Sequence, residues 1–406
     1  MKNDPKKVIV RKSYYTFSKE YPAGNIDTGR NYKRYRSRKK TVLRVVLFAL
    51  LFCGVLAAEF FWTDLSLKIS NRPIDNETQI SAATDENGAV VTALTEGELR
   101  AMAMPVQTIA DRVSVRKSIK QLRRFDCNAV ILDFKLRDGH LLYASLEQPA
   151  LLAKCSLFSN ETVRTAIKQY QSAGIHVLAR VYCFEDPLIA AQNPAFAVTY
   201  MDTQVPWLDK KEEEGGKAWL NPYSGKARAY LLSLLREINA FQISGVILES
   251  VCFPDSENLD SATFPGESGG AARNGVLTRF LEKAKEVLSE GRFLLVGMTA
   301  ADLRRGNDVL YEGTLSSDKI DGYFVHTAGS VDTTEKHFDY ESPVNAFETL
   351  ATHVPNGQAM MLDIPQAEYK DKYARQLIKA GFRHLAITDD EIEIEEESSE
   401  PEDATT

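Results

Sequence analysis

The sequence predicts an α/β protein built around a (β/α)8 barrel of the TIM type, preceded by a single transmembrane helix and a flexible stalk. Three observations support this fold. Between a polar stalk and an acidic tail lie residues 96 to 388 of the 406-residue chain, the usual size of such a barrel. Apolar segments alternate there with helical patterns. Within the segment 128 to 134, residues 129 to 134 are apolar except for Asp133, as expected for a parallel strand buried on both faces.

Eight segments have the pattern of strands: 99–105, 128–134, 175–183, 245–251, 292–299, 321–326, 359–363 and 384–388. The segments between them carry apolar residues at helical spacing, such as Val163, Ile167 and Tyr170. An open doubly wound sheet fits the same alternation. The number of strands and the length of the domain favour a closed barrel, and the first and last strands are the least secure.

The chain outside the barrel divides by charge. Residues 1 to 41 hold 13 Lys or Arg and three acidic residues, which gives this segment a net charge of +10. Because the whole chain has a net charge of −7, the remaining residues together carry −17. Residues 63–95 are polar and rich in turn-forming residues, which indicates a linker. Residues 389–406 include ten Asp or Glu and are expected to form a disordered, solvated tail.

Residues 42–62 are apolar apart from Arg44 and Glu59 and end in an aromatic cluster. A helix of that length covers about 30 Å, enough to span a bilayer. The basic tail is then expected to stay in the cytoplasm and the barrel to lie outside the cell, anchored in the cell membrane by one pass. A cleaved signal peptide is the alternative, but the leader is long for one. The anchor explains the basic cluster better than a nucleic-acid-binding arm does.

The chain contains five cysteines, and their spacing matches no zinc motif. We therefore expect neither a metal site nor a cofactor. Cys183 and Cys252 follow two neighbouring predicted strands, so a disulfide between them is one interpretation. Buried free thiols are the other.

Charged residues at strand ends are the candidates for chemistry, because the carboxyl ends of parallel strands form the ligand-binding face of a barrel. Asp133 and Lys135 share parity and are expected to point to one side of their strand. Arg180 interrupts an apolar strand and needs a partner there. Glu249 and Asp363 end two further strands as candidate catalytic carboxylates. His326 is a candidate binding residue, although a core histidine has the same pattern.

A loop of about forty residues after the third strand holds Trp207, Trp219 and Tyr223. Connections in such folds are usually much shorter, and long ones often form lids or binding loops. Aromatic faces with a polar edge suit stacking on sugar rings. The alternative is that these side chains pack the loop onto the barrel.

Four blocks of the sequence, NAVILDFKLRDGHLLYAS, HVLARVYCFEDPLIAAQNP, AWLNPYSGKARAYLLSLLREI and GVILESVCFP, resemble successive blocks of a bacterial family of glycoside-hydrolase-like barrel domains. The resemblance covers residues 120 to 255 and implies a (β/α)8 fold. It puts these residues on family motif positions: Asp133, Lys135, Arg180, Asp186, Asn221, Pro222 and Tyr223. The chain departs from the family after the fourth strand, where Glu249-Ser250-Val251-Cys252-Phe253-Pro254 replaces a run of the type Asp-Tyr-x-Arg-Phe-Pro.

These patterns predict a membrane-anchored domain that acts on or binds a polysaccharide or another component of the cell envelope. In the enzymatic hypothesis, Glu249 protonates the leaving oxygen and Asp133 or Asp363 serves as nucleophile or base. Lys135, Arg180, Asp186, Trp207, Trp219, Tyr223 and His326 would bind the substrate. The alternative is a catalytically inactive barrel that binds glycan or protein in envelope assembly, with the basic tail free to recruit cytoplasmic factors.

Overall fold

The computed structural model of the chain describes residue 94 and residues 97–266, 270–327, 343–365 and 371–388. All of them lie in one compact unit, Ala82–Thr406. The predicted anchor, residues 42–62, the basic and acidic tails, and nearly all of the predicted linker lie outside the described residues. No helix in the described ranges is both long and apolar enough to cross a bilayer.

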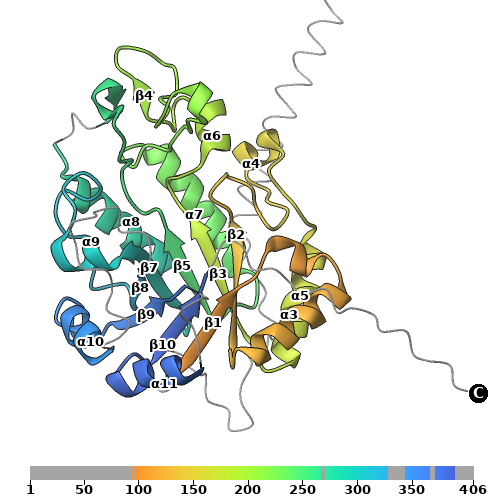
Figure 1. Ribbon diagram of the computed structural model, residues 1–406. Helices are drawn as coiled ribbons and strands as arrows, with labels where there is room; N and C mark the ends of the chain where they lie inside the picture. The colour runs from red at the N-terminus through yellow and green to blue at the C-terminus, as the bar shows by residue number, and fades with distance from the viewer. Residues whose placement is uncertain (1–93, 95–96, 267–269, 328–342, 366–370, 389–406) are drawn as a thin grey trace, which may run out of the picture. The chain divides into compact units, whose positions relative to one another are not determined.

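Eight parallel strands close into a barrel in the order β1-β10-β9-β8-β7-β5-β3-β2. The barrel strands are β1 (Leu99–Ala103), β2 (Ala129–Lys135), β3 (His176–Tyr182), β5 (Gly245–Glu249), β7 (Phe293–Thr299), β8 (Gly322–His326), β9 (Ala359–Asp363) and β10 (His384–Ile387). Each predicted strand is confirmed to within two residues at either end. The first and last strands lie side by side and pair in parallel, Leu99 with His384 (Figure 1). The barrel is therefore closed, not an open doubly wound sheet.

Helices surround the barrel on the outside (Figure 1). They are α3 (Arg112–Arg124), α4 (Gln148–Ala153), α5 (Asn160–Ser172), α6 (Pro187–Gln192), α7 (Gly225–Asn239), α8 (Arg273–Val287), α9 (Ala300–Arg305), α10 (Pro343–Ala351) and α11 (Asp371–Ala380). The three residues of the predicted stripe on α5 are buried against the barrel, as their spacing requires. Ser159 begins this helix, because its hydroxyl accepts a hydrogen bond from Thr162 N and satisfies one free backbone donor.

The long loops after β3 and β5 fold against each other. A short antiparallel pair joins them, β4 (Thr199–Tyr200) with β6 (Ala262–Thr263). Three short 3-10 turns complete the described elements, Val106–Ile109, Glu212–Glu214 and Leu259–Ser261. The four described cysteines are free thiols, three buried and Cys252 partly buried, so the disulfide interpretation is wrong.

The inside of the barrel is filled by an apolar layer contributed by all eight strands. It consists of Leu99, Ala101, Ala103, Ala129, Ile131, Leu178, Ile247, Phe293, Leu295, Phe324, Met361 and Ala386. A second, larger cluster fills the space between the strands and the helices. The barrel is therefore a packed core, and the only place where its inner face can carry polar groups is at its ends.

Candidate functional site at the carboxyl end of the barrel

A polar cluster lies directly above the apolar layer, at the carboxyl ends of the strands. Side chains alternate along a strand, so the residue two positions after an inward-facing residue also faces inward. Ile131, Leu178, Ile247, Phe324, Met361 and Ala386 all belong to the inner layer. Two positions after these six stand the polar residues Asp133, Arg180, Glu249, His326, Asp363 and Thr388. Together with Tyr182, they are called the mouth cluster.

At the centre of the mouth cluster, His326 joins two carboxylates. Its Nδ1 lies 2.8 Å from Asp363 Oδ2, and its Nε2 lies 3.1 Å from both carboxylate oxygens of Glu249. Thr388 Oγ1 donates a further hydrogen bond to Asp363 Oδ2 at 2.6 Å. A hydrogen-bonded chain therefore runs from β5 across β8 to β9 and the end of β10, in which Glu249 and Asp363 are buried and the His326 side chain is 27% exposed.

The charge state of this chain follows from its geometry. Burial disfavours the imidazolium form, but Glu249 and Asp363 outweigh it and raise the pKa of His326 to about 10. Burial likewise opposes the charged form of Glu249, yet the His326 imidazolium, with Arg180 and Arg137 farther away, holds the pKa of Glu249 below its usual range. At neutral pH Glu249 is a carboxylate bonded to a cation. The role expected for it, donating a proton to the leaving oxygen, does not fit, because it has no proton to give.

Gly297 on β7 makes room for the Glu249 side chain. It follows Leu295 of the inner layer by two positions and therefore faces the barrel axis. A Cβ atom at this position would overlap with Oε2 and Cδ of Glu249. The carboxylate thus fills the space that a side chain on β7 would take.

Asp133 is held by Arg180 on the neighbouring strand. The two residues are in register between β2 and β3, and Arg180 donates from Nε to Oδ1 at 2.5 Å and from Nη2 to Oδ2 at 2.9 Å. This bidentate pair supplies the partner that a buried guanidinium requires. The guanidinium also lies 5.4 Å from the ring centroid of Tyr182, and Arg137 lies 5.2 Å from the same centroid.

Lys135 does not share the side of Asp133, which corrects the sequence prediction. The register of β2 with β3 shifts between Asp133 and Lys135, so Lys135 pairs with Val181 instead of Tyr182. Its ammonium group lies 3.1 Å from Asp186 Oδ2 and donates to the carbonyl oxygen of Tyr182 at 2.8 Å. The side chains of Lys135 and Asp186 are both fully buried. The pair therefore ties the start of the loop after β3 to β2, beyond the reach of a ligand.

The aromatic residues of the loop after β3 are mainly structural. Trp207 is fully buried, and its indole N–H points to Asn258 O and Ser261 Oγ, both at 3.1 Å. Trp219 is partly exposed and donates to Asp209 Oδ2. Tyr223 donates to Ala271 O at 2.8 Å. Packing of the loop, the alternative interpretation, holds for Trp207, whereas Trp219 and Tyr223 keep some exposed surface.

Sequence reasoning missed Glu185, a carboxyl group at the same end of the barrel. It accepts hydrogen bonds or ion pairs from Arg137 Nε at 3.1 Å, Lys217 Nζ at 3.8 Å and Ser250 Oγ at 3.1 Å. Burial raises the pKa of Glu185, although both cations act in the opposite direction. The sequence signal for Glu185 is its position in FEDP, three residues beyond the end of β3 and next to Asp186.

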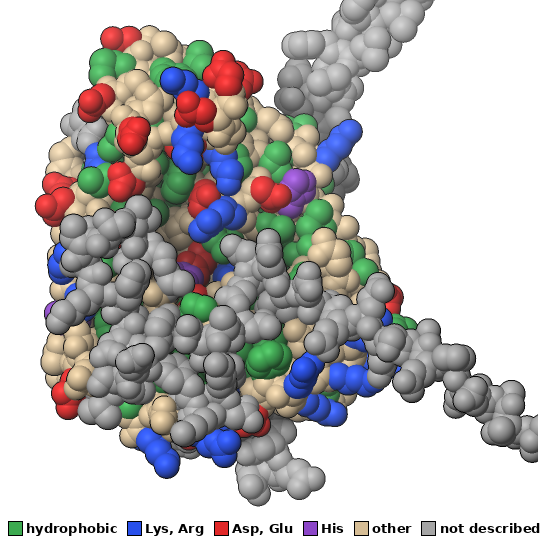
Figure 2. All heavy atoms as spheres, viewed as in Figure 1, with side chains coloured by type: hydrophobic (Ala, Val, Ile, Leu, Met, Phe, Trp, Pro, Cys, Tyr) green, Lys and Arg blue, Asp and Glu red, His purple; other side chains and the backbone are tan. Residues whose placement is uncertain are grey.

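Charged side chains of both signs gather at the centre of the face in Figure 2, with a histidine beside acidic side chains in the hollow there. Within the described ranges, no group of three or more His, Cys, Asp or Glu side chains is arranged to hold a metal ion. The mouth cluster itself holds three carboxylates, the Arg180 guanidinium, the His326 imidazole and the hydroxyl groups of Thr388 and Tyr182.

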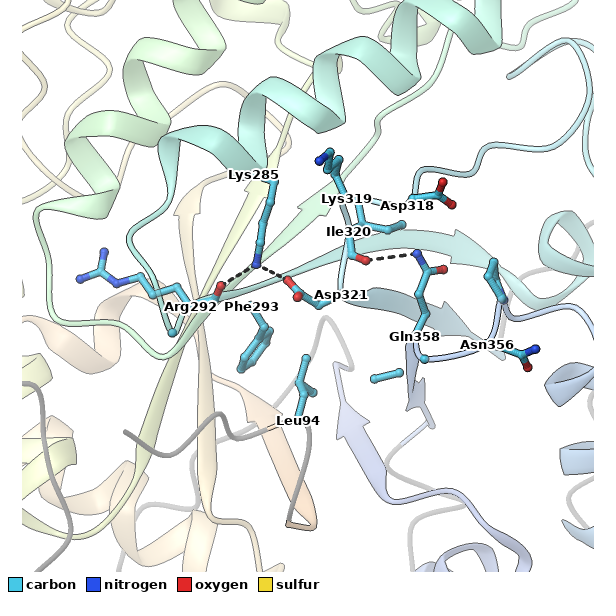
Figure 3. A pocket seen from close by; sticks show the side chains of 14 residues that line it. Leu94, Lys285, Arg292, Phe293, Asp318, Lys319, Ile320, Asp321, Asn356 and Gln358 are labelled. Atoms are coloured by element: carbon cyan, nitrogen blue, oxygen red, sulfur yellow. Dashed lines mark hydrogen bonds and ion pairs between the residues drawn. The ribbon is translucent and has the colours of Figure 1, made fainter. Parts of the chain in front are cut away.

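A separate cavity of about 540 Å³ opens at the amino ends of β7, β8 and β9 (Figure 3). Lys285 pairs there with Asp321 at 2.5 Å, and Gln358 Nε2 donates to Ile320 O at 3.1 Å. None of the predicted site residues lines this cavity. It lies at the end of the barrel that in this fold contributes to stability instead of catalysis.

Part of the barrel is similar to a known family of domains. Residues 101–298 match a family model described as "putative glycosyl hydrolase domain". No curated protein matches the chain. Among solved structures, a hypothetical protein from Ruminiclostridium thermocellum is 23% identical, with 48% of this chain and 96% of that chain covered and a TM-score of 0.42.

Two enzymes of known class are also similar in structure. The catalytic domain of β-amylase from Paenibacillus polymyxa is 10% identical, with 72% of this chain and 92% of that chain covered and a TM-score of 0.45. A family 20 exo-β-N-acetylglucosaminidase from Vibrio harveyi is 13% identical, with 66% of this chain covered and a TM-score of 0.42. The chain spans only 41% of that enzyme's length. The chain therefore contains a closed (β/α)8 barrel, and residues 101–298 of it are similar to a glycosyl hydrolase domain.

Proposed function

We propose that this chain is a membrane-anchored, extracytoplasmic glycosidase that binds a polysaccharide of the cell envelope at the carboxyl end of its barrel and hydrolyses a glycosidic bond there. The observation that carries the proposal is Glu249, an ionised carboxylate at the mouth of the barrel, held by the His326 cation. Glycosidases of this type cleave with one ionised and one protonated carboxyl group.

Glu249 takes the role of nucleophile or base in this proposal. The other two candidate carboxylates are positioning groups, since Asp133 is bonded to Arg180 and Asp363 to His326 and Thr388. The imidazole ring of His326 lies between Glu249 and Asp363. Glu249 and Asp363 therefore cannot hold a water molecule between them as an inverting pair would, and we assign Glu249 as the nucleophile of a retaining mechanism.

The proposed location rests on the sequence. A tail with a net charge of +10 precedes an apolar segment long enough to span a bilayer. An anchored barrel would meet glycans of its own envelope, and the rim of the mouth carries exposed Arg137 and partly exposed Lys217 to bind their polar groups.

The substitution Glu249→Gln tests the proposal. We expect hydrolysis of an envelope polysaccharide preparation, measured as release of reducing ends, to fall by about 10²- to 10⁴-fold, because the amide cannot attack or accept a proton. Glu213→Gln, an exposed residue of the 3-10 turn Glu212–Glu214, is the matched control and should keep full activity. Unchanged hydrolysis by Glu249→Gln would remove this residue from the mechanism.

The second candidate function is binding of glycan without turnover. The bidentate pair of Asp133 with Arg180 favours it, because a carboxylate neutralised in this way is typical of a structural ion pair. In that case the wild-type protein would retain the polysaccharide without releasing reducing ends, Glu249→Gln would bind equally well, and Trp219→Ala would weaken binding.

A further inference from the structure

We propose that Glu185, and none of the carboxylates inside the barrel, donates the proton to the leaving group in the cleavage. This inference rests on the proposed function and assigns the acid that the hydrolysis requires. The position of Glu185 relative to Glu249 supports this assignment.

The backbone brings the two glutamates to the same part of the mouth. Beyond Tyr182 the chain continues alongside the end of β5, because Cys183 N donates to Glu249 O at 2.8 Å and Phe184 N donates to Ser250 O at 3.1 Å. Glu185 follows immediately. Ser250 adopts a left-handed backbone conformation with a φ of 50°, which is uncommon for a residue other than glycine, and its hydroxyl donates to Glu185 Oε2. Ser250, the residue directly after Glu249, therefore turns the chain and donates a hydrogen bond to Glu185.

Arg137 links the two carboxyl groups electrostatically. Its Nε lies 3.1 Å from Glu185 Oε2, and its charge also contributes to the lowered pKa of Glu249. Its guanidinium packs on the Tyr182 ring, which Arg180 also contacts. The Arg137 side chain is 60% exposed and the Glu185 side chain 11% exposed, so Glu185 lies just beneath the exposed rim that Arg137 forms.

The surroundings of the two glutamates shift their pKa values in opposite directions. Burial raises the pKa of Glu185, whereas His326 holds the pKa of Glu249 low. Two carboxyl groups at one site whose pKa values move apart are the usual arrangement of an acid and its partner carboxylate. Asp133 and Asp363 are less suited to the role, since Arg180 contacts both carboxylate oxygens of Asp133, and His326 and Thr388 both bond to Oδ2 of Asp363.

The chemistry balances with these two residues alone. A Glu249 carboxylate oxygen attacks the anomeric carbon and forms an ester bond, the glycosidic carbon–oxygen bond breaks, and the Glu185 proton passes to the departing oxygen, which leaves as an alcohol. Water then attacks the same carbon while the Glu185 carboxylate takes its proton. The ester bond breaks, Glu249 leaves as a carboxylate, and Glu185 is protonated again.

Glycosides with good and poor leaving groups test this assignment. Dinitrophenolate departs without a proton, whereas a sugar hydroxyl needs one. We expect Glu185→Gln in the full-length protein to lower kcat/KM for envelope polysaccharide by about 10²- to 10⁴-fold and to leave kcat/KM for dinitrophenyl hexosides and N-acetylhexosaminides within a few fold of wild type, because this ratio reports the first step alone. The kcat for the dinitrophenyl substrates should fall, since water then attacks without its base. The alkaline limb of the pH–rate profile should also disappear, because that limb reports ionisation of the acid.

Three results would contradict the role of Glu185 or the proposed function itself. Equal losses of kcat/KM on both substrates, or full activity on both, would overturn the role of Glu185 while the proposed function stands, provided that Glu249→Gln loses activity on both. No hydrolysis of either substrate by the wild-type protein would contradict the proposed function itself, and the inference with it. Thermal melting of Glu185→Gln and of the control Glu213→Gln shows whether either variant fails to fold.

Discussion

Replacing Gly297 by alanine is expected to lower polysaccharide hydrolysis by about 100-fold or more, although only a methyl group is added. The new Cβ atom would overlap with Oε2 and Cδ of Glu249. Glu249 cannot turn aside freely, since it is buried and bonded to His326. It must therefore shift, and a displacement near 1 Å of a reacting group costs about 100-fold in rate.

The added methyl group should cost comparatively little stability, about 1–3 kcal/mol for overpacking. Measurements of kcat/KM and of urea unfolding on the same preparations separate the two effects. Gly275→Ala on α8 is the matched control, because a Cβ atom there meets no neighbouring atom within 4 Å. Wild-type rates in Gly297→Ala would contradict the position assigned to Glu249.

Replacing His326 by alanine is expected to lower the free energy of unfolding by about 3–5 kcal/mol, because it leaves Glu249 and Asp363 buried without the cation between them. The pKa of Glu249 should rise once its nearest positive charge is lost, so hydrolysis should fall as well. His140→Ala, at an exposed ion pair with Asp138, is the control and should change stability by less than about 1 kcal/mol.

The effect of pH has a definite sign. The pKa of His326 is raised from 6.5 to about 10 on folding, so its contribution to stability is complete below pH 6.5 and is lost as the pH rises toward about 10. The pKa of Glu249 is lowered, so its contribution is present above its unfolded value of 4.5 and is lost on acidification. The stability advantage of the wild-type protein over His326→Ala should thus shrink on the alkaline side. An advantage that stayed constant from about pH 6.5 to 10 would contradict the charged form of His326.

The strands and most of the mouth cluster could be predicted because strand periodicity is a local property. Once residues 129–135 or 245–249 are recognised as strands, alternation assigns Asp133 and Glu249 to the inside. The same rule failed at Lys135, since a shift of register between neighbouring strands depends on tertiary contacts that the local sequence does not show.

The residues whose roles the sequence did not predict lie outside the strands, where the alternation of inward and outward side chains no longer applies. Glu185 stands beyond the last residue of β3, where parity no longer assigns a side, and its partners Arg137 and Lys217 come from two different loops. Trp207 is apolar enough to be buried in a loop core as readily as exposed to a sugar, and only the fold distinguishes the two. The charge state of Glu249 was unpredictable for a similar reason, because His326 is 77 residues away in sequence.

The most direct test of the account is the protonation state of His326 at neutral pH. Nuclear magnetic resonance of protein containing isotope-labelled histidine resolves the imidazole signals of the chain's six histidines, and the signal missing from His326→Ala identifies the one of interest. The account predicts an imidazolium with a pKa near 10, still protonated well above neutrality. A His326 that titrates near its ordinary value of 6.5 would contradict the ionised Glu249 on which the proposed chemistry depends.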